Sequence, residues 1–555
     1  MSELLTAIAI VFAAAAALLF VATKLSLPTI PLYIVAGLLV GPFIEGQVLE
    51  LAQWGIALLV FVFGVGIEPG RLGSVARDSY APAIVQLVAT GVAGYVIGLG
   101  LGFSSLNALY LGVAAALSSS LVGEELLAGE IYNDFINARL AQSVHFLQDL
   151  VAVVLVLLLG AATFTPEAIQ SQLLAGGLLI GGALAVRYVV FDLLVRLSGE
   201  IEELLLLSSI SVLMGFIGLA ELLGVSIVVG AFAAGLAVAS DFAESQAMLN
   251  GLESLNDFFA AIFFVSLGAL VALPTGSALV FAAVLLVLTI VVKPLLVTLL
   301  FLRQGYDTRT ASETGFNLDQ ISEWTLIIAI EALILGRILP DLFAAIVLVA
   351  AASMITSAYT HRQHDRVWEL LDRSGMLRSF RRGTKAESHV SEGIAGHVIL
   401  AGFGEQGQTA AGTETEAVGE ACADLGIELV VIDNDPVSIA DAKEQYDNYV
   451  YGDIFNPRTW KRANASEALL IVSTMADRRI SETILDVESD ANRMLTATDT
   501  DEALLLLEKG AFYVNVPDVL AAEQLSEHLE SVLTQPDYCD GLRQQNVAEL
   551  QRRVS

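Results

Sequence analysis

Asp149 is an ionisable side chain within an apolar stretch that continues to Leu159. Arg139 is the last basic residue before it, ten positions upstream. At about 1.5 Å per residue along a helix, this spacing places the carboxylate about 15 Å into a hydrocarbon core of about 30 Å. A carboxylate at such a depth costs about 3 kcal/mol or more unless it is paired or has a function, so Asp149 predicts an ion pathway.

Two further charges repeat this spacing. Lys293 lies ten residues before Arg303, and Asp319 lies ten residues after Arg309. If both arginines mark the same membrane face, both side chains share the depth of Asp149. The alternative for each charge is a structural ion pair that holds helices together, and the sequence leaves this open.

Apolar runs fill the first 360 of the 555 residues, and they raise the mean hydropathy of the chain to +0.70. This composition predicts an all-α, polytopic membrane domain over residues 1–360. The first run lacks the basic residues of a signal peptide, so we count it as a span. Thirteen candidate spans result, near residues 3–23, 28–43, 51–68, 80–102, 106–128, 137–160, 171–191, 203–222, 225–239, 254–273, 277–302, 310–335 and 340–360.

The distribution of basic residues predicts the orientation. With thirteen spans and the N-terminus outside, only Arg337 falls outside, and the inner side receives Lys24, Arg71, Arg77, Arg139, Arg187, Arg196, Arg303 and Arg309. Cytoplasmic loops of membrane proteins carry such an excess. We therefore expect a multi-pass protein of the plasma membrane, surrounded by lipid, with a basic cytoplasmic linker over residues 361–390 and a cytoplasmic C-terminal part.

Polar residues interrupt the fifth and twelfth spans. Ser118, Ser119 and Ser120 divide the fifth, and residues 317–323 divide the twelfth, seven spans later. Transporters built from inverted repeats place their ion sites where two such broken helices cross near the midplane. Unwound backbone there exposes carbonyl groups to a cation. The alternative is that the serines bond only to the preceding helical turn.

These segments resemble the cation/proton antiporter superfamily, and within it the Kef-type potassium/proton antiporters. Residues 116–120 are similar to the family motif A-L-S-S-T, and Gln148 with Asp149 matches a Q-D pair in the sixth span. Residues 315–324 follow G-L-x-L-A-Q-G-G-E-F. The resemblance covers nearly the whole chain. It implies a homodimer that exchanges a monovalent cation for protons.

Taken with the buried charges, the resemblance implies that the transported ions bind at Asp149, Gln148, Lys293, Ser118, Ser119, Ser120, Asp319, Gln320 and Glu323, with the cation at Asp149. A Gln-Asp pair goes with K⁺ in the Kef branch, whereas an Asp-Asp pair goes with electrogenic Na⁺ exchange. Gln148 thus favours K⁺ and leaves Na⁺ as the alternative. Asp319 replaces a family alanine, and Ile321 and Ser322 replace glycines, so selectivity or stoichiometry is expected to differ.

From Ser391 onward the sequence predicts a Rossmann-like α/β domain over residues 391–520, followed by a helical tail over residues 521–555. A short apolar strand runs into G-x-G-x-x-G, which comprises Gly402, Phe403, Gly404, Glu405, Gln406 and Gly407. Later strands end in the polar residues Asp433, Asn434, Asp453, Ser473 and Thr474. Such a succession predicts a nucleotide site, with phosphates at a helix N-terminus and an acid on the ribose.

This second domain resembles the regulator-of-K⁺-conductance, or TrkA-N, domain of Kef-type antiporters. The resemblance implies a regulatory adenine nucleotide: AMP, ATP or NAD(H). Thirty-one residues separate Gly402 from Asp433, more than the usual spacing of about twenty, and residues 412–416 are expected to interrupt the first helix. A degenerate fold that serves only dimerisation is therefore the alternative to a nucleotide sensor.

The remaining composition narrows the functional classes. From residue 391 onward, 30 acidic residues oppose 11 basic ones, a surface that excludes nucleic acid as a partner. A K⁺ channel with the same regulatory domain is disfavoured because no T-V-G-Y-G-like filter occurs. An NAD-dependent enzyme is disfavoured because no catalytic His, Cys or substrate domain accompanies the fold. The sequence thus favours a transporter over an enzyme.

Overall fold

The computed structural model describes residues 2–25, 27–43, 48–66, 76–132, 135–161, 164–191, 202–238, 246–272, 274–363, 386–403, 410–534, 542 and 547. The chain forms two compact units. The first holds Met1–Ala128, Asn137–Phe301 and Ala311–Arg378. The second holds Gly129–Ile136, Leu302–Thr310 and Ser379–Ser555. The domain limits drawn from the sequence at residues 360, 390 and 520 stay predictions.

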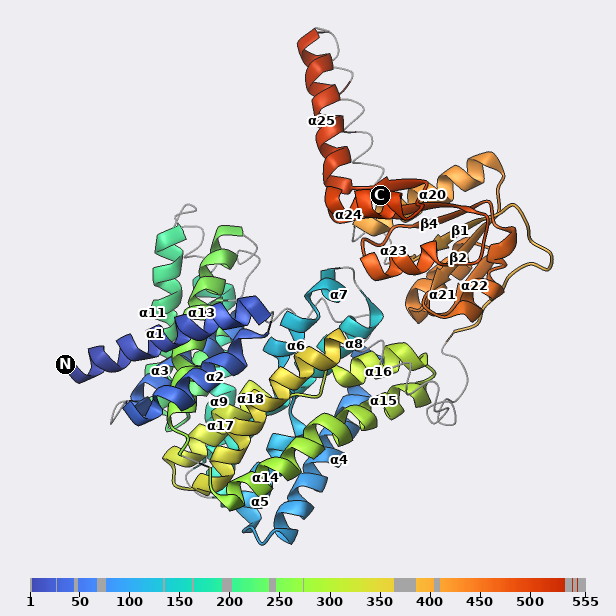
Figure 1. The fold of residues 1–555 in the computed structure, drawn as a ribbon. Coiled ribbons are helices and arrows are strands. Elements are labelled where there is room, and N and C mark those ends of the chain that lie inside the picture. The colour runs from blue at the N-terminus through green and yellow to red at the C-terminus, as the bar shows by residue number, and fades with distance from the viewer. Residues whose placement is uncertain are drawn as a thin grey trace. The chain divides into compact units, whose positions relative to one another are not determined.

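Helices make up the N-terminal part of the described chain (Figure 1). In order they are α1 (Ser2–Leu25), α2 (Thr29–Val40), the 3₁₀ turn η1 (Gly41–Phe43), α3 (Val48–Val65), α4 (Ala76–Gly100), α5 (Ser105–Ala116), α6 (Ser120–Leu126), α7 (Ala128–Tyr132), α8 (Ile136–Leu159), α9 (Pro166–Ala185), the π-helical η3 (Val186–Phe191), α11 (Glu202–Leu222), α12 (Ile227–Val238), α13 (Gln246–Ala269), α14 (Gly276–Val287), the π-helical η5 (Leu288–Val292), α15 (Lys293–Gln304), α16 (Thr308–Phe316), α17 (Glu323–Ile334) and α18 (Pro340–Arg362).

Six helical segments in the described ranges are long and apolar enough to cross a membrane: Asp78–Gly100, Ser105–Leu126, Ile136–Leu159, Pro166–Val189, Gly276–Gln304 and Pro340–Arg362. Helix α4 shows why they suit lipid. Val85, Val88, Val92 and Val96 recur at helical spacing and are 47–60% exposed, which forms an apolar outer face. Shorter apolar helices accompany these six, and the predicted total of thirteen spans stays a prediction.

Glycines allow helices of the first unit to pack closely. A Cβ atom at Gly235 of α12 would lie 2.3 Å from the carbonyl oxygen of Phe61 on α3, and the facing Gly64 is equally crowded by α12. Small residues at such crossings let backbones approach, which is the main packing device between helices in lipid. The close contact of α3 with α12 therefore depends on glycine.

The second unit contains a six-stranded parallel sheet in the order β3-β2-β1-β4-β5-β6. Its elements are β1 (Val398–Ala401), α20 (Ala410–Leu425), β2 (Leu429–Asp433), α21 (Pro436–Gln445), β3 (Asn448–Tyr451), α22 (Pro457–Arg462), the 3₁₀ turn η7 (Ala465–Glu467), β4 (Leu470–Ser473), α23 (Arg478–Leu485), β5 (Asn492–Thr496), α24 (Thr500–Glu508), β6 (Tyr513–Asn515) and α25 (Pro517–Thr534). Alternate residues of the central strands enter two separate apolar cores, one on each face of the sheet. This strand order is that of dinucleotide-binding Rossmann domains, so the predicted fold class is confirmed.

One expectation for this unit is wrong. Helix α20 runs without interruption through residues 412–416, so this segment is neither a loop nor a break. Helix formation wins at 412–416 because Ala and Glu surround the single glycine and favour a helical backbone.

Candidate functional site

Two broken helices meet in the first unit. Helix α5 ends at Ala116 and α6 begins at Ser120, while α16 ends at Phe316 and α17 begins at Glu323. The hydroxyl of Ser118 donates to the carbonyl oxygen of Leu318 at 3.0 Å, so the two unwound segments are in direct contact. Each break leaves backbone groups without helical partners. The side chains around the breaks satisfy several of these groups.

Lys293 binds the carbonyl groups of both breaks. Its Nζ donates to the Leu117 oxygen at 3.0 Å and to the Gln320 oxygen at 2.7 Å, and the side chain is fully buried. The π-helical turn η5 directly precedes this lysine, and such turns often occur at functional positions. An ammonium group at these carbonyls offsets the partial negative charge of helix C-terminal ends. Lys293 thus joins the two broken helices through their backbone.

Glu323 occupies the opposite end of the breaks. Its Oε1 accepts a hydrogen bond from the Ser120 hydroxyl at 2.7 Å and one from the Leu121 N–H at 3.4 Å. The carboxylate therefore lies at the N-terminus of α6, where the helix dipole favours negative charge. Its second oxygen has no hydrogen-bond partner among the residues that the structure describes.

Asp149 of α8 lies beside this pair. Its side chain is 4% exposed, and Oδ1 has no hydrogen-bond partner within the described ranges. The Ser120 hydroxyl and the Trp324 indole face the carboxylate, and the Glu323 charge lies close enough to interact with it. Carboxylate and hydroxyl oxygens that converge in this way suit a dehydrated monovalent cation, or a proton on either acid.

The three charges that the sequence places at one depth have different interaction partners in the structure. Asp319 is fully buried next to Lys293 and Ser357, and both of its carboxylate oxygens are without hydrogen-bond partners in the described part of the chain. Asp149 instead groups with Glu323. The breaks therefore carry an acidic pair at their N-terminal ends, and a lysine with its own carboxylate at their carbonyl ends.

The other residues expected at the ion site support the breaks. Ser119 is the N-cap of α6, where its Oγ accepts from the Val122 N–H at 3.2 Å. The Gln320 side chain donates to Ser357 Oγ at 2.9 Å. Gln148 uses its amide oxygen to accept from the Ser118 N–H at 2.7 Å. Of these three side chains, Gln320 keeps a buried amide oxygen without a hydrogen-bond partner among the described residues.

Sequence reasoning missed two residues of α18 that hold the second break. Ser357 binds Gln320, and Ser353 accepts from the Ile321 N–H at 3.1 Å. Both lie in an otherwise apolar span, four positions apart and therefore on one helix face. Paired hydroxyl residues at helical spacing within a membrane span were the signal that could have identified them.

The nucleotide loop of the second unit is built around Asp433. Gly402 has φ of +88°, a conformation that favours glycine, and the following Phe403 N–H donates to Asp433 Oδ2 at 2.8 Å. Asp433 Oδ1 accepts from the Asp435 N–H at 2.8 Å. The carboxylate that we expect to bind the ribose hydroxyls thus also stabilises the glycine turn. Gly404, Glu405, Gln406 and Gly407 lie outside the described residues.

The other predicted contacts of the nucleotide follow the ends of β2, β3 and β4. Asn434 directly follows β2. Asp453 Oδ1 accepts from the Phe455 N–H at 3.0 Å, and Thr474 Oγ1 donates to the Gly402 oxygen at 3.3 Å. The buried Ser473 hydroxyl has no hydrogen-bond partner in the described ranges. Parallel strands end at one edge of a sheet, which is where Rossmann folds bind ligands.

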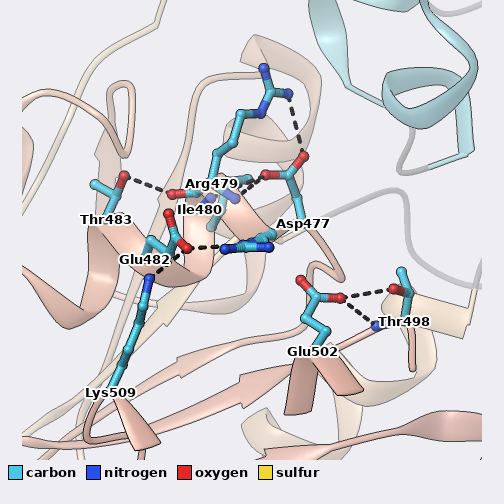
Figure 2. Close-up of polar contacts among 9 residues, drawn as sticks. Asp477, Arg479, Ile480, Glu482, Thr483, Thr498, Glu502 and Lys509 are labelled. Carbon is cyan, nitrogen blue, oxygen red and sulfur yellow. Dashed lines mark hydrogen bonds and ion pairs between the residues drawn. The ribbon is translucent and has the colours of Figure 1, made fainter. Parts of the chain in front are cut away.

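A polar cluster that the sequence did not single out surrounds the start of α23 (Figure 2). Asp477 is the N-cap and accepts from the N–H groups of Arg479 and Ile480 at 2.8 and 3.1 Å. Glu482 accepts from Lys509 at 2.7 Å and from Arg478 at 2.9 Å. These hydrogen bonds, the one from Lys509 first, hold the pKa of Glu482 below its usual range. Because these acids and bases satisfy one another, the cluster stabilises the domain locally.

Comparison with known proteins defines the class. Residues 9–361 match the family described as sodium/hydrogen exchanger, transmembrane, and residues 398–517 match the TrkA-N domain. The first match covers more than half of the chain. This protein belongs to the transmembrane sodium/hydrogen exchanger family and carries a C-terminal TrkA-N domain.

Particular relatives extend the match over both domains. The chain is 26% identical over 534 residues to the glutathione-regulated potassium-efflux system protein KefC of Salmonella schwarzengrund, covering 90% of this chain and 81% of the relative. It is 26% identical over 493 residues to KefC of Klebsiella pneumoniae, covering 85% and 76%. Among solved structures, the sodium proton antiporter MjNhaP1 of Methanocaldococcus jannaschii matches 65% of this chain and 99% of its own, with a TM-score of 0.50 and 17% identity. That likeness shows a shared fold.

Proposed function

We propose that this protein exchanges K⁺ for protons across the plasma membrane, with Asp149 as the residue that binds either ion. The observation that carries the proposal is the buried Asp149 carboxylate beside Glu323 and Ser120, at the crossing of two broken helices. K⁺ is favoured because the relatives named KefC are described as potassium-efflux proteins. Na⁺ is the second candidate, since the family description names sodium.

Competition at one site couples the two fluxes. The Asp149 carboxylate binds a proton or a cation but not both, because protonation removes the negative charge and the oxygen lone pair that hold the cation. Glu323 and the Ser120 hydroxyl supply further oxygens for the cation. Lys293 holds the two breaks together at their carbonyl ends, so these oxygens keep their spacing. A cation released on one side of the membrane is thus replaced by a proton.

The second unit is proposed to sense an adenine nucleotide and to regulate flux without consuming the ligand. The glycine turn at Gly402, held by Asp433, supports this role because it follows the first strand at the position where Rossmann folds bind the phosphates of a nucleotide. AMP, ATP and NAD(H) are the candidates. We further propose a homodimer, with the N-terminus outside the cell, the TrkA-N domain in the cytoplasm and lipid around the helices.

Reconstitution of the full-length protein in liposomes tests the proposal. A pH-sensitive dye inside the liposomes reports proton movement when K⁺, Na⁺, Li⁺ or Rb⁺ is added outside. We expect exchange with K⁺ at the lowest concentration, and loss of exchange in Asp149→Asn because an amide cannot alternate between a proton and a cation. Asp341→Asn is the matched control, since Asp341 lies in the first turn of α18, away from the breaks.

Three results would contradict the proposal. Exchange that persists in Asp149→Asn removes the central residue. Half-saturation by Na⁺ at a lower concentration than by K⁺ favours the second candidate. A passive K⁺ current without proton movement indicates a channel.

A further inference from the structure

A pair of buried glutamines spans the break between α5 and α6. Gln86 of α4 and Gln148 of α8 are both fully buried, although they lie 62 positions apart. Gln148 Nε2 donates to Gln86 Oε1 at 2.8 Å, which joins the two amides. Gln86 lies on the inner side of a helix whose opposite face is apolar and exposed.

The free ends of this pair bind the backbone of the break on both sides. Gln86 Nε2 donates to the Ala116 oxygen at 2.8 Å, and Gln148 Oε1 accepts from the Ser118 N–H at 2.7 Å. These are the carbonyl at the end of α5 and an amide of the unwound segment. Each would cost about 1–3 kcal/mol if it were buried without a partner.

An amide pair makes this chain of hydrogen bonds without a net charge. Each amide has a donor and an acceptor, whereas a carboxylate lacks the donor and an ammonium lacks the acceptor. The third contact of Gln86, from Nε2 to Thr90 Oγ1 at 3.1 Å, uses its remaining N–H. In this conformation both functional ends of the Gln148 amide are engaged, the oxygen by the Ser118 N–H and the nitrogen by Gln86.

We propose that Gln86 is a positioning residue that determines cation preference. Through Gln148 it holds the unwound segment 117–119 at a set distance from α8, and Ser120 follows directly on that segment. The space between Ser120 and Asp149 then suits a cation of one size. Gln148 therefore influences ion choice indirectly, through its hydrogen bonds to Gln86 and to the backbone of the break. This inference rests on the exchange function proposed above.

The test measures half-saturating concentrations of K⁺ and Na⁺ for the full-length protein in liposomes. Gln86→Leu, of similar size, removes all three side-chain hydrogen bonds of Gln86. Gln86→Glu keeps the acceptor for Gln148 but loses the donor to Ala116. We expect the K⁺ over Na⁺ preference to change about two- to tenfold in Gln86→Leu, the equivalent of one net hydrogen bond. The maximal rate should change less than this ratio.

The matched control is Asn107→Ala. Asn107 is a buried amide at the other end of α5, and its Oδ1 accepts from the Leu339 N–H at 2.8 Å. Its loss removes a buried hydrogen bond of the same helix without touching the break, so stability falls while the cation ratio stays constant. If a general loss of helix packing caused the effect, Gln86→Leu and Asn107→Ala would change the K⁺ over Na⁺ preference by similar amounts.

A double-variant cycle decides whether the two glutamines act together. We expect Gln86→Leu and Gln148→Leu combined to change the ratio no more than either alone. Additive effects would overturn the proposal, because Gln148 would then act on the cation directly. An unchanged ratio in both Gln86 variants overturns it too, and leaves the exchange function standing if the wild type still exchanges. A wild type that exchanges no cation for protons refutes both.

Discussion

The hydroxyl of Ser118 donates to the carbonyl of Leu318, which joins two broken helices whose bonded residues are 200 positions apart in the chain. Around this contact, side chains form hydrogen bonds to both breaks. Lys293 binds a carbonyl of each break, and Glu323 from one break accepts a hydrogen bond from Ser120 of the other. Any movement of one broken helix is therefore transmitted to its counterpart, which suits a site that must be exposed on alternate sides of a membrane.

Lys293→Met is expected to lower the free energy of unfolding by about 3 kcal/mol, because two buried carbonyl groups lose a charged donor. Lys293→Gln should lose less, since its amide can still donate to one of them. Thermal unfolding of the protein in detergent measures the difference. Lys24→Met is the control, because Lys24 is exposed in the last turn of α1. An unfolding temperature equal to that of the wild type in Lys293→Met would show that the carbonyl contacts contribute little.

Gly235→Ala is expected to destabilise the first unit by about 1–3 kcal/mol, the usual range for overpacking. The added methyl would lie 2.3 Å from the Phe61 oxygen, and a backbone carbonyl cannot move aside as a flexible side chain can. Gly218→Ala on α11 is the matched control because no atom lies within 4 Å of its added carbon. There, the better helix propensity of alanine should leave stability unchanged or raise it by up to about 1 kcal/mol. Equal unfolding temperatures for the two variants would contradict close packing of α3 on α12.

Asp433→Ala is expected to weaken nucleotide binding at least tenfold, because it removes both the acid expected on the ribose and the acceptor that holds the Phe403 N–H. Calorimetry of the full-length protein in detergent with AMP, ATP, NAD and NADH measures this. Asp447→Ala serves as the control because Asp447 is an exposed acid that follows α21. If the wild type gives no heat with any of the four ligands, the domain acts as a scaffold for dimerisation.

Lys509→Met is expected to reduce the stability of the second unit at neutral pH and to have no effect in acid. The hydrogen bond from Lys509 lowers the pKa of Glu482 in the folded state. A carboxyl with a depressed folded pKa stabilises the protein above its unfolded pKa, near 4.3, and this contribution is lost as the pH falls through the folded value.

Since the pair is partly exposed, its contribution at pH 7 is at most about 1 kcal/mol. Unfolding followed at several pH values tests this. Lys443→Met, at an exposed lysine in the last turn of α21, controls for the loss of one positive charge. A stability difference that persists well below the usual pKa of Glu482 would contradict the assignment.

The sequence by itself determined what depends on local pattern. Apolar runs, serine interruptions at 118–120 and the polar stretch at 317–323 predicted helices broken at both places, and the structure confirms the helical class. The short hydrophobic runs that end at Asp433 and Ser473 predicted strands of a parallel sheet. This pattern can be recognised from the sequence because each hydrophobic run and its polar end are only a few residues apart. The expected interruption at 412–416 is wrong because the Ala and Glu residues around Gly412 favour a continuous helix over a break.

Only the tertiary structure decided which polar groups meet. Gln148 binds Gln86, Glu323 binds Ser120, and Lys293 binds backbone carbonyls. Spacing along the chain gives the depth of a charge in a helix but not its rotation or its neighbours. The grouping of Asp319 with Lys293, and of Asp149 with Glu323, is decided in this way. Hydrogen bonds between residues 62 to 203 positions apart depend on how the helices pack, and packing is a property of the whole fold.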